Sequence, residues 1–162
     1  MNKIEKTFQE LKRKKQKALI TFITAGDPDI DSTVHHIHAL EKGGADIIEL
    51  GVPFSDPLAD GPVIQKSALR SLKSGTTLKK IIKMVCLVRR TCSVPIVLMS
   101  SYNPIFRYGE EEFVKDSINA GVDGVIIPDL PPEEATSLSN LAKTNELDMI
   151  FLLAPTSTKE RI

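Results

Sequence analysis

The sequence predicts an α/β protein built on a parallel sheet that helices cover. Short apolar, β-branched runs occur five times along the 162 residues, and segments of helical periodicity separate them. The runs are apolar throughout instead of alternating with polar residues, which is typical of strands buried on both faces. The sequence GADII at 44–48 returns as GVDGV at 121–125, each time where a helix ends and a strand begins. Such an internal repeat indicates repeated βα units.

The first elements are recognised by periodicity and by turn residues. Residues 1–15 are expected to form an amphipathic helix, because apolar residues recur at helical spacing between charged ones. Residues 18–24 (ALITFIT) follow as a strand, which the turn sequence Ala-Gly-Asp-Pro closes. Asp31 or Ser32 is then placed to cap a second helix, and the glycine pair at 43–44 ends it.

The next strand is residues 46–50 (DIIEL), and a loop rich in proline and glycine follows it. Pro62 suits the first position of a helix, because proline at that position loses no intrahelical hydrogen bond. Leu69 and Leu72 are expected to face inward from this helix. One of the threonines at 76–77 caps a further helix with an apolar face.

The second half of the chain continues the alternation. Residues 95–100 and 124–128 are expected strands, separated by a helix at 110–119. Residues 131–134 (PPEE) open another helix, from which two leucines face inward. Residues 148–154 (DMIFLLA) form the fifth strand.

Repeated βα units occur in closed barrels and in open doubly wound sheets. No glycine-rich phosphate motif follows any expected strand, which weakens the nucleotide-binding open sheet as an alternative. A (βα)₈ TIM barrel needs roughly 200–250 residues, and this chain supplies about five units and an N-terminal helix. We therefore expect residues 1–162 to be a single domain, the N-terminal portion of a TIM barrel and of a longer protein.

Composition excludes several classes of partner. Lys and Arg together number 21 and Asp and Glu also 21, so the chain has none of the excess positive charge that nucleic acids and anionic membranes attract. No apolar run is long enough to span a bilayer, and the amino terminus is too charged for a signal peptide. Cys86 and Cys92 have no metal-binding spacing and are expected to be free buried thiols, so we expect a cytoplasmic protein.

Glu49 is the most informative residue. It lies near the carboxyl end of a strand otherwise made of Ile and Leu, and it shares a face with Ile47. A buried carboxylate must be paired, hydrogen-bonded or functional, because an isolated buried charge is costly. Active sites of (βα)₈ enzymes lie at the carboxyl ends of the strands, and apolar surroundings raise the pKa of an acid. We therefore expect a general acid–base; the alternative is a structural carboxylate bound to a loop amide or an arginine.

The loop after this strand holds two further carboxylates, Asp56 and Asp60, among three prolines. Proline restricts the backbone, so this loop is stiffer than most. It is also long for a βα connection, and such loops are often lids or contact surfaces. Asp60 could reach over the strand ends to a substrate N–H or hydroxyl. The alternative is a turn-forming Asp60-Gly61 pair.

The remaining candidate residues mainly argue against a metal site and against a lysine nucleophile. The three histidines lie together on the second helix without a carboxylate ligand at useful spacing, so no metal site is expected. No strand end carries a lysine, which excludes a Schiff-base nucleophile in this part of the chain. Asp129 could line a pocket or begin a helix. Phe22 could form an aromatic wall or belong to the core.

Residues 49–65 (ELGVPFSDPLADGPVIQ) resemble the signature of the tryptophan synthase alpha chain family. Shorter motifs occur in the family's order. They are TAGDP at 24–28, YNPI at 102–105, IPDLP at 127–131 and LAPT at 153–156. The resemblance covers essentially the whole chain, and the long loop motif is highly specific.

The resemblance implies a (βα)₈ barrel that cleaves indole-3-glycerol phosphate to indole and glyceraldehyde 3-phosphate in tryptophan biosynthesis, a retro-aldol lyase reaction without metal or organic cofactor. In the family, the glutamate matching Glu49 moves the protons that make indole a leaving group. The aspartate matching Asp60 stabilises the positive charge on the ring nitrogen. The resemblance also implies substrate contacts by Phe22, Ile127 and Asp129.

The family's partner is a beta chain that uses pyridoxal phosphate, and indole passes to it inside a tetramer of two alpha and two beta chains. The residues matching Asp56, Pro57 and Leu58 belong to the loop that faces this partner. The resemblance therefore implies that the stiff loop is both a lid and a docking surface.

This chain departs from the family's pattern in two places. Many members have two tyrosines before Asn-Pro, where this chain has Ser101-Tyr102, so the pocket role of the first tyrosine is lost or passes to a neighbour. The family's phosphate site lies beyond Ile162, so we expect no useful activity from this chain alone. Two alternatives are a truncated, non-catalytic module that binds and modulates a beta-type partner, and a different phosphate-handling barrel such as an isomerase of the same pathway.

Overall fold

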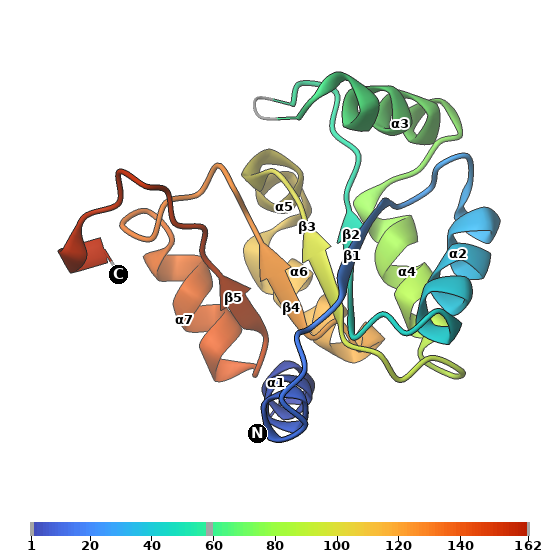
Figure 1. The fold of residues 1–162 in the computed structure, drawn as a ribbon. Coiled ribbons are helices and arrows are strands. Elements are labelled where there is room, and N and C mark those ends of the chain that lie inside the picture. Colours follow the sequence, from blue (N-terminus) through green and yellow to red (C-terminus); the bar gives the residue numbers. More distant parts are fainter. Residues whose placement is uncertain (1, 58–59, 162) are drawn as a thin grey trace.

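The computed structural model describes residues 2–57 and 60–161 and contains one parallel five-stranded sheet (Figure 1). The strands are neighbours in the order of the sequence, as in a (βα)₈ barrel and unlike a doubly wound sheet, whose strand order reverses at one point. They are β1 (Ile20–Thr24), β2 (Ile47–Gly51), β3 (Ile96–Met99), β4 (Gly124–Ile126) and β5 (Asp148–Ile150). The predicted parallel α/β sheet is therefore confirmed.

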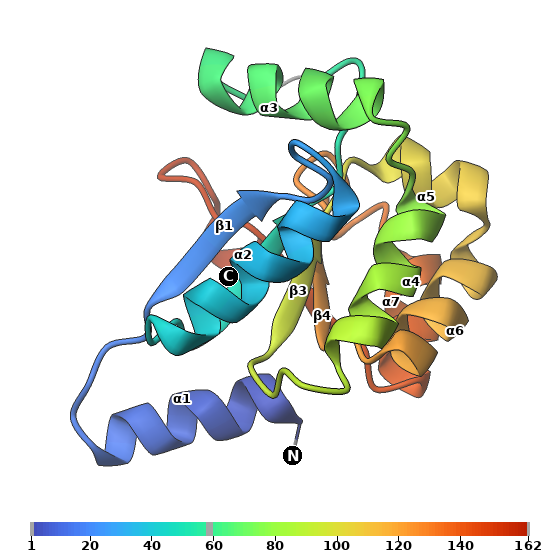
Figure 2. The same cartoon turned by 90° about the vertical axis from the view of Figure 1, so that its right-hand side faces the viewer.

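The helices occupy three places around this sheet. They are α1 (Lys3–Arg13), α2 (Ile30–Lys42), α3 (Pro62–Lys73), α4 (Leu78–Val88), α5 (Tyr102–Tyr108), α6 (Glu110–Ala120) and α7 (Thr136–Thr144), followed by a 3₁₀ turn at Lys159–Arg161. Helices α2, α4, α6 and α7 follow one another along one face of the sheet (Figure 2). Helix α1 lies at the amino ends of the strands and α3 at their carboxyl ends (Figure 1). None of the helices in the described residues is long and apolar enough to cross a membrane.

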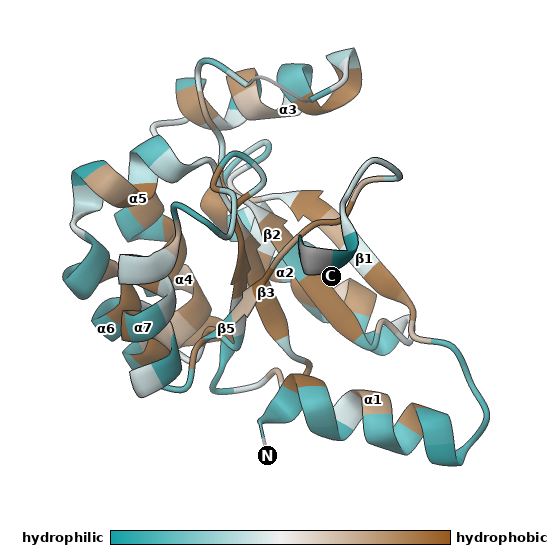
Figure 3. Ribbon diagram, turned by 90° about the vertical axis from the view of Figure 1, so that its left-hand side faces the viewer, coloured by the Kyte–Doolittle hydropathy of each residue, from teal (hydrophilic) through white to brown (hydrophobic). Residues whose placement is uncertain are grey.

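Both faces of the sheet are apolar (Figure 3). Alternate strand residues such as Ile48 and Leu98 pack against the covering helices in the larger cluster. The other residues of the same strands form a second cluster on the opposite face, which we call the inner face. This cluster consists of Ile47, Val97 and Ile126 with Ile4 of α1. The period of two thus places Glu49, which follows Ile47 on the same side of β2, on the inner face.

The sequence repeat has one structural role in both copies. Its glycine adopts a positive φ, +93° in the first copy and +86° in the second, and so ends the helix. The aspartate two residues later accepts a hydrogen bond from the backbone at the start of the preceding strand. Asp46 Oδ2 accepts from Leu19 N at 2.7 Å, and Asp123 Oδ2 accepts from Ile96 N at 2.8 Å. Each aspartate therefore connects two successive βα units.

Some expected details are wrong. Helix α2 begins at Ile30 with Asp29 as its cap, not Asp31 or Ser32, because the Asp29 carboxylate accepts a hydrogen bond from Ser32 N at 2.7 Å. Leu69 does not face inward; it is 52% exposed, because α3 crosses the strand ends and does not cover the sheet. The Cys86 thiol is exposed, whereas Cys92 is buried as expected.

The second half of the chain also differs from expectation. Helix α5 was not expected, since the motif that opens it contains a proline. Residues 131–134 form a turn, and α7 begins only at Thr136. Strand β5 ends at Ile150 instead of residue 154, and the leucines at 152 and 153 are more than half exposed. In the described part of the chain β5 pairs only with β4, and this pairing covers residues 148–150.

Candidate functional site

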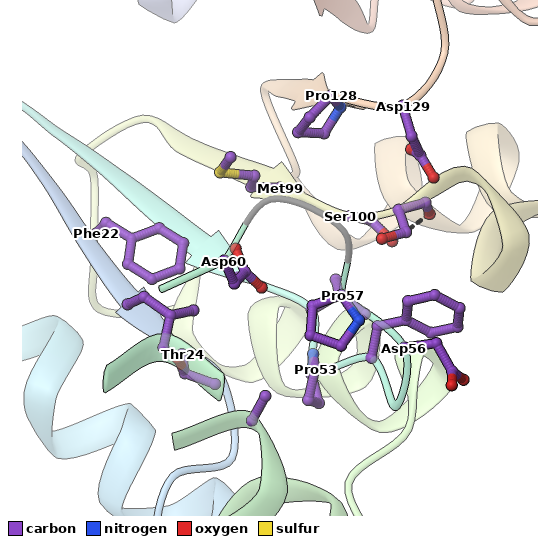
Figure 4. Close-up of a pocket in the computed structure, with 16 residues that line it drawn as sticks. Phe22, Thr24, Pro53, Asp56, Pro57, Asp60, Met99, Ser100, Pro128 and Asp129 are labelled. Atoms are coloured by element: carbon purple, nitrogen blue, oxygen red, sulfur yellow. Dashed lines mark hydrogen bonds between the residues drawn. The ribbon is translucent and has the colours of Figure 1, made fainter. Parts of the chain in front are cut away.

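A cavity of about 280 Å³ opens where the first four strands end (Figure 4). Because the strands are parallel, the loops that follow them meet at this end of the sheet. Four segments line the cavity: the ends of β1 and β2 with the loop that leads to α3, α3 itself, the end of β3, and the segment after β4. The lining residues are Phe22, Thr24, Gly51, Val52, Pro53, Phe54, Asp56, Pro57, Asp60, Ile64, Ala68, Met99, Ser100, Ser101, Pro128 and Asp129.

Glu49 is the third residue of β2 and lies on the inner face, in register with Phe22 of β1 and Val97 of β3. It is half-buried and has no hydrogen-bond or ion-pair partner among residues 2–57 and 60–161. Burial raises the pKa of its carboxyl above the usual value. It is not itself a lining residue, but its neighbour Phe22 and the next inner-face residue of β2, Gly51, both are. Glu49 is therefore an acid beside the cavity that no described side chain binds.

The ring of Phe22 covers the end of β2. A Cβ atom added to Gly51 would lie 2.5 Å from Cζ and 2.7 Å from Cε2 of this ring. Glycine at position 51 thus allows the aromatic ring to lie directly against the strand backbone. Phe22 lines the cavity and forms an aromatic wall from β1, which is one of the two alternatives for this residue; its contact with a substrate stays a prediction.

Asp60 lies in the loop before α3, and its exposed side chain lines the cavity near Phe22 (Figure 4). Its backbone oxygen accepts a hydrogen bond of 2.8 Å from Gln65 Nε2. Asp56 and Pro57 line the same cavity, and Asp56 Oδ2 accepts a hydrogen bond of 2.5 Å from Ser55 Oγ. Leu58, the third predicted partner-facing residue, lies outside the described residues.

Asp129 lines the cavity on the side of β3 and β4 (Figure 4). Its Oδ1 atom accepts a hydrogen bond of 2.9 Å from Tyr102 N, so the carboxylate is held at the start of α5. Ile127 is 6% exposed, packs in the core under the helices and borders a smaller cavity between the ends of β4 and β5. The structure therefore brings Phe22, Asp60 and Asp129 to one cavity and places Ile127 outside its lining.

Several lining residues had no predicted role. Met99 ends β3 and Ser100 follows it, and the rule that sites lie at strand ends could have identified both. Ser101 lines the cavity at the position where the family often has tyrosine. Ile64 and Ala68 reach the cavity from α3. No pattern in the sequence indicated that α3 lies across the strand ends.

The described residues hold no group of three or more His, Cys, Asp or Glu side chains suited to a metal ion. The histidines of α2 lie away from the cavity: His35 Nδ1 bonds to Asp31 O at 2.8 Å, and His38 Nδ1 lies 3.9 Å from Glu41 Oε2. The side-chain groups at the cavity that could take part in catalysis are carboxyls and hydroxyls. Such groups can transfer protons and orient a polar substrate.

The fold and the site together define a barrel-type protein, with repeated βα units, an inner apolar face and carboxyl groups at the carboxyl ends of its strands. The family model described as "Tryptophan synthase alpha chain" matches residues 8–162. The chain belongs to this family, which confirms the resemblance seen in the loop motif.

Relatives and solved structures agree with this assignment. The tryptophan synthase alpha chains of Geotalea daltonii and Pelobacter propionicus are 58% and 57% identical to this chain over all of its 162 residues. The chain spans 61% of the length of each. It matches their N-terminal part.

A tryptophan synthase alpha subunit from Legionella pneumophila superposes with a TM-score of 0.97 at 44% identity, covering 99% of this chain and 62% of that one. Tryptophan synthase from Mycobacterium tuberculosis, in its aminoacrylate-bound form, gives a TM-score of 0.94 at 36% identity, covering 99% and 65%. The fold is therefore a partial TIM barrel.

Proposed function

We propose that this chain supplies the proton-transfer part of a lyase that cleaves indole-3-glycerol phosphate to indole and glyceraldehyde 3-phosphate. The observation that carries the proposal is the state of Glu49. Its carboxyl is half-buried on an apolar face, has a raised pKa and borders the cavity that Asp60 lines. A carboxyl with a raised pKa holds its proton more firmly than usual, and its conjugate base takes a proton back more readily, so the same group can act as donor and acceptor.

The proposed chemistry follows from the bond that must break. The bond between the indole ring and the glycerol side chain breaks readily only after the ring carbon has accepted a proton, because the ring then takes the bonding electrons. Glu49 is the proposed donor, and its carboxylate then takes the proton of the hydroxyl next to the breaking bond, so that the side chain leaves as the aldehyde and Glu49 is protonated again. Protonation leaves a positive charge on the ring nitrogen, and the exposed carboxylate of Asp60 can stabilise that charge. Phe22 offers a flat apolar wall for the ring, and Ser100, Ser101 and Asp129 offer polar groups to the side chain.

The loop before α3 is the proposed contact with a beta chain. Asp56 and Pro57 lie on it at the carboxyl ends of the strands. A solved structure similar to this chain is a tryptophan synthase complex from Pyrococcus furiosus, with a TM-score of 0.84 at 44% identity over 89% of this chain. We infer that this chain, within a full-length protein, takes the alpha position in such a complex, in the cytoplasm.

The direct test uses residues 1–162 continued by the remaining C-terminal part of the Geotalea daltonii relative, a protein we call the extended chain. Glu49→Gln keeps the size of the side chain but removes its acid, and we expect a loss of at least about 10²-fold in kcat. Asp60→Asn removes a charge that matters only when the ring is cationic, and we expect a loss of about 10²-fold. Lys73→Gln, an exposed change on α3, serves as the control. Indole release is measured.

Parent-like activity of the Glu49→Gln protein would refute the proposed role of Glu49. We also expect that the 162-residue chain without an extension releases no measurable indole. Among residues 2–57 and 60–161, only α1 packs on the inner face of the sheet, at one end, and an open site admits water and weakens electrostatic stabilisation. Indole release by this chain at the rate of the extended chain would contradict that expectation.

A further inference from the structure

Helix α3 is attached to the rest of the protein by small and polar side chains. Its buried residues are Ser67, Ala68 and Ser71, whereas Val63 and Leu69 are 75% and 52% exposed. A helix that buries so little apolar surface gains little from the hydrophobic effect. Its position must therefore depend on specific hydrogen bonds.

These hydrogen bonds join α3 to the end of β1 and the turn that follows. Thr24 Oγ1 and Ser67 Oγ share a hydrogen bond of 2.6 Å. One turn further along α3, Ser71 Oγ donates to Ala25 O at 2.6 Å. The backbone approaches closely here, since a Cβ atom added to Gly26 would lie 2.6 Å from Ser71 Oγ. The two segments thus fit together without space for a larger residue.

An ion pair completes the attachment. Arg70 Nε donates to Asp27 Oδ1 at 2.8 Å, and Arg70 Nη2 donates to Asp27 Oδ2 at 2.7 Å. The two parallel bonds fix both the distance and the angle between the side chains, which a single contact does not. The arginine side chain is 57% exposed, so the pair adds little to overall stability. Its effect is chiefly geometric.

The position of α3 determines the position of Asp60. The helix begins at Pro62, two residues after Asp60, and Gln65 Nε2 on the first turn donates to Asp60 O at 2.8 Å. Ile64 on the same helix lines the cavity beside Asp60. A shift of α3 across the strand ends would therefore move the Asp60 carboxylate and one wall of the cavity together.

We propose that Asp27 and Arg70 are positioning residues for Asp60, an inference that rests on the function proposed above. Neither side chain lines the cavity among the described residues. They act through the placement of α3, so that the Asp60 carboxylate lies where positive charge develops on the substrate. A misplacement of about 1 Å at a reacting centre can cost up to about 10²-fold in rate.

The test is a set of variants of the extended chain. Arg70→Gln and Asp27→Asn each remove the ion pair, and we expect each to lower kcat about 10-fold with a change in KM below about 3-fold. Arg70→Lys keeps the charge but cannot form the two parallel bonds, so we expect it to resemble Arg70→Gln. Lys73→Gln, on the same helix, is the matched control and should keep parent activity.

The decisive comparison is Arg70→Gln made in the Asp60→Asn protein. If the ion pair acts through Asp60, the second substitution should lower kcat less than about 2-fold further. An equal 10-fold loss in both backgrounds would show a merely structural role and overturn the proposal. If the Arg70→Gln protein is fully active while the Asp60→Asn protein is strongly impaired, the positioning role of the ion pair is overturned and the proposed function stays in place. Full activity of Asp60→Asn would overturn both.

Hydrogen exchange provides a second measurement that needs no activity. We expect Arg70→Gln to speed amide exchange in α3 by about 2- to 5-fold and to leave α4 unchanged, because an exposed ion pair contributes little free energy and local opening depends on local contacts. Unchanged exchange in α3 would show that the ion pair does not hold the helix, and would overturn the proposal.

Discussion

Replacing Gly51 by alanine would place a methyl group against the ring of Phe22. The added carbon would lie 2.5 Å and 2.7 Å from two ring atoms, whereas apolar carbons normally approach to about 3.5–4.0 Å. The ring must therefore move by about 1 Å. Because Phe22 is only half-buried and borders the cavity, it can move into that space.

We expect Gly51→Ala to destabilise the extended chain by about 1 kcal/mol, at the low end of the range for overpacking. The displaced ring occupies part of the cavity, so under the proposed function we expect indole release to fall about 10-fold or more. Urea unfolding measures the free energy of unfolding, and steady-state kinetics measure the rate of indole release. Lys73→Gln is the stability control, since its side chain is exposed.

A double-mutant cycle with Phe22→Ala isolates the contact. Without the ring, Gly51→Ala should have almost no effect on stability, and the coupling free energy should equal about 1 kcal/mol. A Gly51→Ala cost that is unchanged in the Phe22→Ala protein would refute this reasoning. It would mean that the cost arises from the strand backbone and not from the ring.

Three further predictions concern other parts of the chain. Replacing Phe113, which is fully buried on α6, by alanine should lower the free energy of unfolding by about 3–5 kcal/mol, as measured by urea unfolding. Burial and the hydrogen bond to Asp116 raise the pKa of Tyr108 from 10.0 to about 12. As the pH rises from 10.0 to about 12, the free energy of unfolding should therefore fall, because the tyrosine ionises first in the unfolded chain. Ultraviolet titration should show this late tyrosine, and its pKa should fall in an Asp116→Asn protein. A thiol reagent should modify Cys86 quickly and Cys92 slowly, because burial protects Cys92 and raises its pKa; equal rates would contradict this.

The sequence predicted those features that depend on local pattern. Parallel strands follow from apolar runs, and the repeat predicted where two strands begin because its glycine and aspartate have the same roles in both copies. Glu49 stood out because a carboxylate is rare in such a strand. The inner-face position and raised pKa found for it agree with the reasoning from period and burial.

Features that depend on tertiary placement could not be predicted. Leu69 is exposed because α3 docks through serines and an arginine, and no helical pattern distinguishes such a helix from one that covers a sheet. For the same reason Ile64 and Ala68 were missed at the cavity. Strand β5 is shorter than its apolar run, because a strand extends only as far as a neighbouring strand pairs with it.

The most direct test of the account is a measurement of how Glu49 titrates in the extended chain. Carbon NMR of labelled glutamate carboxyls, with Glu49→Gln to assign the signal, gives its pKa. We expect a value above the usual 4.5, matched by one limb of the pH profile of kcat/KM for indole release. A pKa at or below 4.5, or a limb that persists in the Glu49→Gln protein, would contradict the claim that Glu49 is the proton donor.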